Sequence, residues 1–497
     1  MMKKSILFIF MPGLTLLLIG YFIQSHLLLS GDVGYLMHAS EQLLRGGQYA
    51  TDFFETNPPM ILYLYAPCYL LKYYLAVSDA TAFRIYIFLG SCLSAGFCYV
   101  LLKQILKNES AAFTYFLFYT LLIIFFILPS LAFGQREHLL IILIMPYLLA
   151  SVLIFKKEKL SYSLRFLIGC MAGVGFALKP FFLVTFGLVE LYGFIKNMTI
   201  IRLECLVILL IFIVYGLSIY LWQPDYLTII LPLVARYYLP FSKQSIIIFF
   251  APPYVLFCMS MIFSYLFFYK KDRVPELSII ILLALMGLLI AAILARTSWY
   301  YHVLPALSMA YLLAAVYLGQ IKDKEMKILL SFFIFVVPFY SYYAQIKYGL
   351  HTKKNHAMNQ VAQFINQSGE HAVYCIPLGT FDCFPFLEAM HGQYVERFPS
   401  FWWYTGLRQQ EKKISLALKA NQDKNYLIKQ VTIDLQRAQW VIFNNAIFNA
   451  DEMIMYLSQN TAFRTEWAYY HYTTHFGDYR LYKRINIGNE NDKSSIN

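Results

Sequence analysis

The stretch that decides the fold is residues 31–60, GDVGYLMHASEQLLRGGQYATDFFETNPPM, which directly follows the apolar run Ile6–Leu29. It contains an acid at Asp32, a short amphipathic segment that ends at two glycines, a second acid at Glu55 and a Pro-Pro break. A connection between two membrane spans has no structural need for this pattern. We therefore expect a function in this loop, at the surface of a bilayer.

The composition is that of a membrane protein. Of the 497 residues, 59% are hydrophobic and 14% are charged, which is too apolar for a soluble fold. A helix needs about 20 apolar residues to cross the bilayer core, and the repeated runs of this kind predict an α-helical polytopic membrane protein with about eleven transmembrane helices. The predicted spans are 6–29, 81–102, 111–129, 138–155, 203–222, 246–269, 277–295, 299–319 and 327–345, together with 166–195, which Lys179-Pro180 divides into two short helices.

The net charge of +12 is explained by topology, so no nucleic-acid partner is predicted. The cations cluster in short loops, as the positive-inside rule expects of cytoplasmic loops. All these loops can be cytoplasmic only if residues 59–76 form a helix on or in the outer membrane surface. The N-terminus is then inside and the C-terminus outside. The first span is too long, and lacks the cleavage site, for a cleavable signal. The clusters are Lys3-Lys4, Lys103/Lys107, Lys156-Lys157/Lys159/Arg165, Lys196/Arg202, Lys270-Lys271/Arg273 and Lys322/Lys324/Lys327.

The long apolar runs stop near residue 346, which predicts two domains. Residues 1–346 form the transmembrane domain, and residues 347–497 form a small extracytoplasmic α/β domain of a plausible size. The segments 361–367 and 435–443 have the pattern of its helices and strands. Outside the cytoplasm, a disulfide between Cys375 and Cys383 is possible, although nothing in the sequence fixes their geometry.

Two acids of the first outer loop are candidate catalytic residues. Asp32 begins an amphipathic helix that is expected to lie flat on the membrane, where it would hold the carboxylate at the interface. The alternative is that Asp32 only caps this helix. Glu55 lies in FFETNPPM, where the two prolines stiffen the turn. The alternative to a catalytic role is that Glu55 is an ordinary solvated glutamate of a loop.

Further polar groups are predicted on the same outer face as candidate substrate-binding residues. An arginine suits a bidentate phosphate contact, and a lysine can supply a compact charge for a phosphate. The alternatives are an ion pair between helices for Arg136, a lysine that reaches the membrane surface for Lys179, and an aromatic belt for Tyr300. A lone histidine is also more often structural than catalytic. The set is Arg136, Glu137 and His138 in QREH, Lys179 in GVGFALKP, and Arg296, Tyr300 and His302 in ARTSWYYHVLP.

The chain contains no P-loop, no dinucleotide fingerprint and no zinc spacing. The order of its motifs resembles the GT-C membrane glycosyltransferases, such as the bacterial aminoarabinose transferases of lipid A and the protein O-mannosyltransferases. The motifs are the acid after the first span, FFETNPPM, an outer-loop motif after the third span, GVGFALKP and RTSWYYHVLP. The resemblance covers most of residues 1–346. For residues 347–497 it extends only to the family's habit of ending in an extracytoplasmic domain.

The resemblance implies inverting transfer of a sugar from a polyprenyl-phosphate donor to a lipid, glycan or protein acceptor on the extracytoplasmic face. It assigns Asp32 as general base or metal ligand and Lys179 to the donor phosphate, while Arg136 could stabilise the leaving group. Thr56 departs from the family, which commonly has lysine or histidine there, and this puts a phosphate contact from that loop in doubt. No cofactor is certain. A divalent cation is possible, with Asp32 as its ligand, although no second acid is adjacent.

The leading hypothesis is therefore a hexosyl- or pentosyltransferase of a bacterial inner membrane, in contact with membrane lipid. Two other classes remain open. A transporter or flippase of a lipid-linked sugar would show broken helices at the midplane and repeated halves, of which only the Lys179-Pro180 break is evident. A polysaccharide polymerase or ligase would have its key loop later in the chain. The Thr56 departure also leaves room for a family member that has lost activity.

Overall fold

The computed structural model describes residues 2–197, 202–241, 245–323, 325, 327–328, 331, 343–347, 356–376, 384–387, 390, 392–411, 417–446 and 449–485. The chain packs as two compact units. The first, here called the helical unit, comprises Met1–Leu28, Asn57–Trp222 and Ser242–Lys353. The second, called the sheet unit, comprises Leu29–Thr56, Gln223–Phe241 and Lys354–Asn497.

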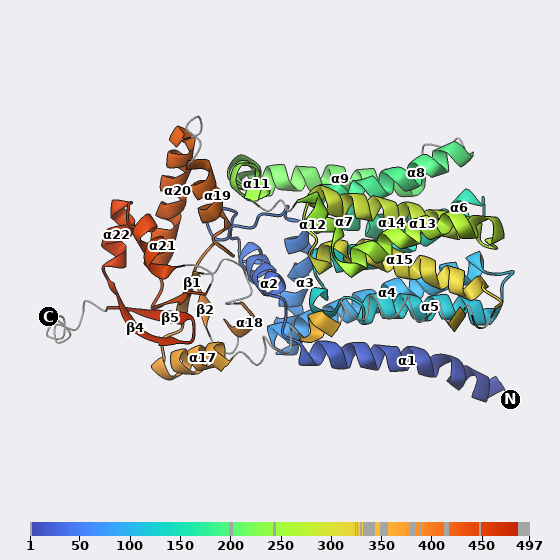
Figure 1. The fold of residues 1–497 in the computed structure, drawn as a ribbon, viewed down its shortest axis with the longest axis horizontal. Helices are drawn as coiled ribbons and strands as arrows, with labels where there is room; N and C mark the ends of the chain where they lie inside the picture. Colours follow the sequence, from blue (N-terminus) through green and yellow to red (C-terminus); the bar gives the residue numbers. More distant parts are fainter. Residues whose placement is uncertain are drawn as a thin grey trace. The chain divides into compact units, whose positions relative to one another are not determined.

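The helical unit is a bundle in which α4, α5, α6, α14 and α15 run side by side (Figure 1). Small residues allow close packing, which membrane helices favour at their interfaces. Gly169 and Gly173, one turn apart on α7, face Val207 and Ile211 of α9, where an added Cβ would lie only 3.0 Å from each side chain. The helices are α1 (Met2–His26), α3 (Met60–Leu75), α4 (Asp79–Ile105), α5 (Ala111–Phe126), α6 (Arg136–Phe155), α7 (Tyr162–Phe176), α8 (Leu183–Asn197), α9 (Leu203–Trp222), α12 (Ile246–Phe250), α13 (Pro253–Phe268), α14 (Pro275–Ala295) and α15 (Tyr300–Gln320), with the short turns η1 (Ser130–Ala132), η2 (Pro180–Phe182) and η5 (Tyr269–Lys271).

The predicted class, a helical polytopic membrane protein, is confirmed. Among the described residues, five helices are long and apolar enough to span a membrane, or six if α1 and the helix after it form one broken span. The other predicted spans correspond to shorter helices. The span 111–129 is the 16-residue α5, 166–195 divides at Lys179-Pro180 as expected, and 246–269 divides near Pro252. Most of 327–345 lies outside the described residues. Residues 59–76 form α3, and their place at the membrane surface stays a prediction.

Two segments that precede residue 346 belong to the sheet unit by packing. The first is the outer loop with α2 (Gly31–Leu44), which ends before Gly46 as predicted. Its residues Val33, Leu36 and Met37 are buried, and Gly34 packs against Phe384. The second was not anticipated from the sequence and comprises the π-helical turns η3 (Tyr226–Ile230) and η4 (Val234–Tyr238) with α10 (Leu231–Leu233) and α11 (Leu239–Phe241). The division into domains 1–346 and 347–497 stays a prediction.

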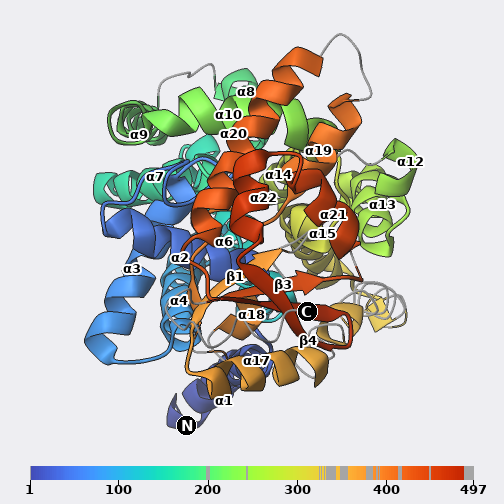
Figure 2. The ribbon, with the colours of Figure 1, turned by 90° about the vertical axis from the view of Figure 1, so that its left-hand side faces the viewer.

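The sheet unit contains a mixed five-stranded sheet with the order β2-β1-β3-β5-β4. Strand β1 pairs in parallel with β2 and β3, whereas β5 pairs antiparallel with β3 and β4. Helix α17 lies on one side of the sheet, and α20 to α22 lie on the other (Figures 1 and 2). The elements are β1 (Ala372–Ile376), β2 (Gln393–Tyr394), β3 (Trp440–Asn444), β4 (Tyr470–Phe476), β5 (Tyr479–Arg484), α17 (His356–Ser368), α18 (Phe384–Leu387), α19 (Trp402–Glu411), α20 (Ala417–Leu435), α21 (Ala450–Leu457) and α22 (Thr461–Trp467).

This arrangement confirms the predicted small α/β domain. Residues 361–367 lie in α17, and residues 435–443 run from the end of α20 into β3. Cys375 of β1 is disulfide-bonded. The six other cysteines that the structure describes are free. Cys383, its predicted partner, lies outside the described residues.

Candidate functional site

The helical unit buries a carboxylate at the start of α6. Gln135 is the N-cap of this helix, and Glu137 lies in its first turn, where the helix dipole favours a negative charge. Gly134 enters the helix with a φ of 74°, and an added Cβ would lie 2.1 Å from the ring of Phe83, so only glycine fits there. Glu137 is 1% exposed. A charge at this depth requires partners.

The first partner of Glu137 is Lys179. Helix α7 ends at Phe176, and Pro180 begins the next turn, which leaves Lys179 in an extended conformation with a φ of −148°. Its ammonium group forms an ion pair with Oε1 of Glu137. The Lys179 side chain is 14% exposed, so it points into the unit and does not reach out to the membrane surface. The break at Lys179-Pro180 thus places a cation beside the buried acid.

The second partner is His302, at the start of α15. Its Nε2 lies 3.7 Å from Oε1 of Glu137, and its Nδ1 hydrogen-bonds to the hydroxyl of Thr297. The ammonium group of Lys179 also lies 6.0 Å from the centre of the Tyr301 ring. Three elements far apart in the sequence therefore meet at one carboxylate. Oε2 of Glu137 has no hydrogen-bond partner in the part of the chain that the structure describes, so the cluster retains an unused acceptor.

The remaining predicted residues of the helical unit take different places. Arg136 is buried beside Glu137 at the start of α6. His138 accepts a hydrogen bond from the amide of Gly134 (2.8 Å), and its other ring nitrogen bonds to the carbonyl of Phe125 (2.9 Å), which gives it a structural role here. The buried Tyr300 donates to the carbonyl of Leu128 at 2.6 Å.

Arg296 does not join the Glu137 cluster. It is exposed and ends α14 in the left-handed conformation, with a φ of 53°. Within the described residues it forms no ion pair. The predicted motif ARTSWYYHVLP therefore contributes His302 to the cluster, with Thr297 and Tyr301 as contacts that the sequence did not reveal.

The two predicted acids, Asp32 and Glu55, belong to the sheet unit. Ser30 takes the N-cap position of α2, and Asp32 is the second residue of the helix, so capping does not explain Asp32. Glu55 is only 4% exposed, which excludes a solvated loop glutamate. Its carboxylate accepts a hydrogen bond from the hydroxyl of Thr56 at 3.4 Å.

Arg397 anchors the loop that carries these acids. Its Nη1 donates to the carbonyl of Ala50 (2.9 Å), and its own carbonyl accepts from the amide of Phe54 (2.8 Å) and from the hydroxyl of Tyr35 (3.1 Å). The guanidinium group is held in turn by the fully buried Asp434 at 2.9 Å. Phe54 directly precedes Glu55, so this network fixes the backbone next to the acid. No motif marked Arg397, although the charged pair Glu396-Arg397 stands between the apolar residues Val395 and Phe398.

Replacing Arg397 with alanine should destabilise the protein by about 3–5 kcal/mol, because the fully buried carboxylate of Asp434 loses the buried one of its two arginine partners. Its other partner, Arg437, is half exposed and remains. Thermal unfolding of the purified full chain measures this loss. Arg408 is a matched control in the same unit, since its pair with Glu452 is exposed and its removal should cost less than about 1 kcal/mol. Equal effects of the two alanine variants would contradict the anchoring role.

Glu396, the neighbour of Arg397, predicts a pH dependence. Burial raises the pKa of Glu396 well above its ordinary value, and the nearby Asp434 adds to this rise. The folded protein then keeps a proton that the unfolded chain releases, so folding stability falls as the pH rises above the ordinary pKa of glutamate. Glu396→Gln should therefore stabilise the protein at pH 8 by about 1.4 kcal/mol or more and change little at pH 4.5. Melting temperatures at the two pH values test this, and an equal gain at both would contradict it.

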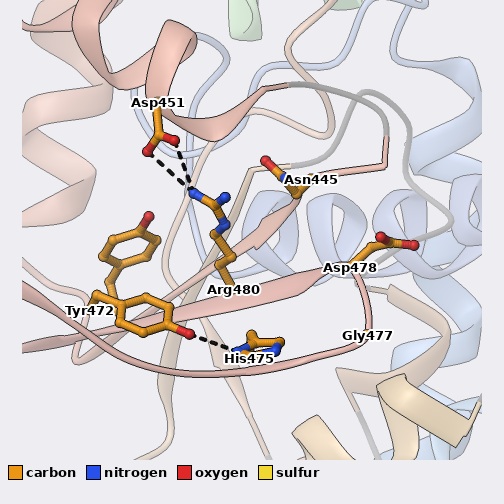
Figure 3. A pocket seen from close by; sticks show the side chains of 8 residues that line it. Asn445, Asp451, Tyr472, His475, Gly477, Asp478 and Arg480 are labelled. Atoms are coloured by element: carbon orange, nitrogen blue, oxygen red, sulfur yellow. Dashed lines mark hydrogen bonds and ion pairs between the residues drawn. The ribbon is translucent and has the colours of Figure 1, made fainter.

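The sheet unit also contains a pocket of about 620 Å³ between the β4–β5 hairpin and α21 (Figure 3). Its polar groups are largely engaged with one another. Arg480 bonds to both carboxylate oxygens of Asp451 at 3.2 Å, and the hydroxyl of Tyr472 bonds to His475 at 2.8 Å. These hydrogen bonds hold the β4–β5 hairpin in place, so the polar residues that line the pocket have a structural role.

A metal centre does not emerge from the described side chains. Among them, no three His, Cys, Asp or Glu residues come together in a way that could hold a metal ion. The predicted single ligand, Asp32, does not by itself make such a site.

Comparisons with known proteins bear on the fold. No protein-family model matches the chain, and no curated protein matches it in sequence. The solved structures that are similar to the chain include two of ArnT from Cupriavidus metallidurans. The apo structure has a TM-score of 0.58 at 12% identity, and the structure bound to undecaprenyl phosphate has a TM-score of 0.54 at 13% identity. Each match covers 97% of this chain and 98% of the other. The expected GT-C glycosyltransferase fold is thereby confirmed.

Proposed function

We propose that this protein is an integral membrane glycosyltransferase, which transfers a sugar from a polyprenyl-phosphate donor to a lipid, glycan or protein acceptor. The observation that carries the proposal is the shared fold, which extends over 97% of the chain to a protein whose structure was solved with undecaprenyl phosphate bound. The cluster of Glu137, Lys179 and His302 supports it, because it holds a largely buried cation, Lys179, which we assign to the donor phosphate.

In the proposed reaction, the carboxylate of Asp32 accepts the proton of the acceptor hydroxyl as its oxygen attacks the anomeric carbon of the sugar. The bond between this carbon and the phosphate oxygen breaks, and polyprenyl phosphate leaves. A single displacement of this kind inverts the anomeric configuration. The developing charge on the phosphate is stabilised by Lys179 and Arg136. Glu55 is proposed to assist Asp32 at the acceptor side.

We place the reaction on the extracytoplasmic face of a bacterial inner membrane. The loop-charge pattern supports this orientation. The disulfide of Cys375 supports it too, because disulfides persist in oxidising compartments and are rare in the cytosol. Residues 354–497 then lie outside, in the same compartment as the acceptor.

Binding of the leaving group tests the donor class. Undecaprenyl phosphate should raise the melting temperature of the purified protein, since a ligand that binds only the folded state stabilises it by about 2.7 kcal/mol at 100 times its Kd. Undecaprenol has the same chain without the phosphate and should have a much smaller effect. Equal shifts of the melting temperature with both lipids would mean that only the polyprenyl chain is bound. That result would contradict a phosphate-binding site.

A further inference from the structure

A second basic site lies at the opposite ends of the helices that carry the Glu137 cluster. A pocket of about 400 Å³ forms where α6 and α8 end and where α7 and α9 begin. Its lining contains three cationic side chains, Lys157, Arg165 and Arg202, and no acidic residue among those described. The sequence placed these cations in two separate cytoplasmic clusters. The fold brings them together in one pocket, for which the proposed transfer reaction has no use.

The two arginines are held in place from inside the unit. Arg165 donates to the buried Glu204 through Nε (2.5 Å) and Nη2 (3.0 Å), which leaves Nη1 for another acceptor. Arg202 is paired with Glu190 and stacks on the ring of Phe155 at 4.7 Å. Such fixed, planar guanidinium groups are suited to contacts with the oxygens of a phosphate.

Lys157 supplies the charge that no carboxylate balances. It is exposed and forms no ion pair within the described residues, whereas its neighbours Lys156 and Glu158 pair with Glu276 and Lys107. With three cations and the two carboxylates that hold the arginines, the pocket keeps a net positive charge of about one, which attracts an anion.

The surroundings of the pocket are those of the membrane boundary. Ile154 and Phe155 end the span α6, and Leu203 begins the span α9. Leu206 lines the pocket and is 50% exposed, and the next turn of α9 continues with exposed Leu209 and Leu210. A ligand with a phosphate group and acyl chains can therefore place its phosphate in the pocket and its acyl chains along α9.

We propose that this pocket binds the headgroup phosphate of an anionic phospholipid. Basic pockets between transmembrane helices on the cytoplasmic side are suited to such headgroups. The site is distinct from the Glu137 cluster, because Glu137 and Phe155 lie at opposite ends of α6, about 27 Å apart along the helix axis. The inference does not depend on the sugar-transfer reaction, and its failure would leave that proposal unchanged.

Lys157→Asn is the sharpest test. Lys157 has a φ of 59°, and asparagine tolerates this left-handed conformation, so the variant removes the charge with little strain. Lys159→Asn removes an exposed lysine two residues away that does not line the pocket. Native mass spectrometry of the full chain in detergent would compare binding of palmitoyl-oleoyl phosphatidylglycerol with that of phosphatidylethanolamine with the same chains.

Wild type should bind phosphatidylglycerol more tightly than phosphatidylethanolamine. Lys157→Asn should weaken phosphatidylglycerol binding about fivefold, which is the effect of one cation near a headgroup. Lys159→Asn should leave it unchanged, and Lys157→Arg should retain it. Equal losses in Lys157→Asn and Lys159→Asn, or no preference of wild type for the anionic lipid, would overturn the proposal. Full displacement of the lipid by an equal concentration of inorganic phosphate would overturn it as well, because the ligand would then be the free ion.

Discussion

Asp32→Asn should lower the rate of sugar transfer by a factor of about 10² to 10⁴, which is the usual contribution of a general base. Asparagine has nearly the same shape as aspartate but cannot accept the proton of the acceptor hydroxyl. Because Asp32 is not the N-cap of α2, the helix should be retained. The measurement is the initial rate of labelled sugar transfer in membranes that contain equal amounts of each protein.

Asp52 offers a matched control in the same loop. Its carboxylate accepts a hydrogen bond from the amide of Gln48 at 2.9 Å, and an asparagine at this position can keep that bond. Asp52→Asn should therefore preserve transfer. A wild-type rate in Asp32→Asn would remove the base assignment, and equal losses in both variants would show that the loop is sensitive to any loss of charge.

The ion pair of Lys179 and Glu137 gives the second large effect. Lys179→Met should destabilise the protein by about 3–5 kcal/mol, since it leaves a carboxylate buried without its cation. The double variant Lys179→Met/Glu137→Gln should recover most of this loss, because the buried charge is gone as well. Thermal unfolding of the two variants measures the difference.

The same pair of variants separates folding from function. If Lys179 contacts the donor phosphate, the double variant stays folded but binds undecaprenyl phosphate about 10- to 150-fold more weakly, which corresponds to a charge-assisted hydrogen bond of about 1.5–3 kcal/mol. Lys196→Met is the control, because its pair with Glu276 is partly exposed and far less costly to break. Normal binding of undecaprenyl phosphate by the stable double variant would limit Lys179 to a structural role.

Most of the helical architecture could be predicted from the sequence, for a physical reason. In a bilayer every backbone polar group must be satisfied inside the protein, and a continuous apolar run of about 20 residues does this within itself only as a helix. The break at Lys179-Pro180 was also predictable, since proline cannot continue a helix and charge is tolerated there only with a partner. The end of α2 before Gly46 followed from the glycine pair.

Other features depend on contacts between distant residues and left no local signal. The partner of Lys179 is 42 residues away along the chain, and that of Arg397 on the first loop is 347 residues away. Residues 223–241 have the apolar composition of a membrane segment, yet Tyr237 hydrogen-bonds to Asp423 of α20 at 2.7 Å and packs in the sheet unit. Of the predicted site residues, Glu137, Lys179 and His302 form one cluster. His138 instead hydrogen-bonds to backbone groups, and Arg296 lies outside the cluster.

The most direct test of the central claim follows the donor itself. Purified protein in liposomes would be supplied with a polyprenyl-phosphate donor, labelled in the sugar and in the lipid, together with membranes that contain acceptors. The proposed transferase predicts one polyprenyl phosphate released for each sugar that appears in product. Donor that remains intact while it moves from one leaflet to the other would contradict the account and identify a transporter.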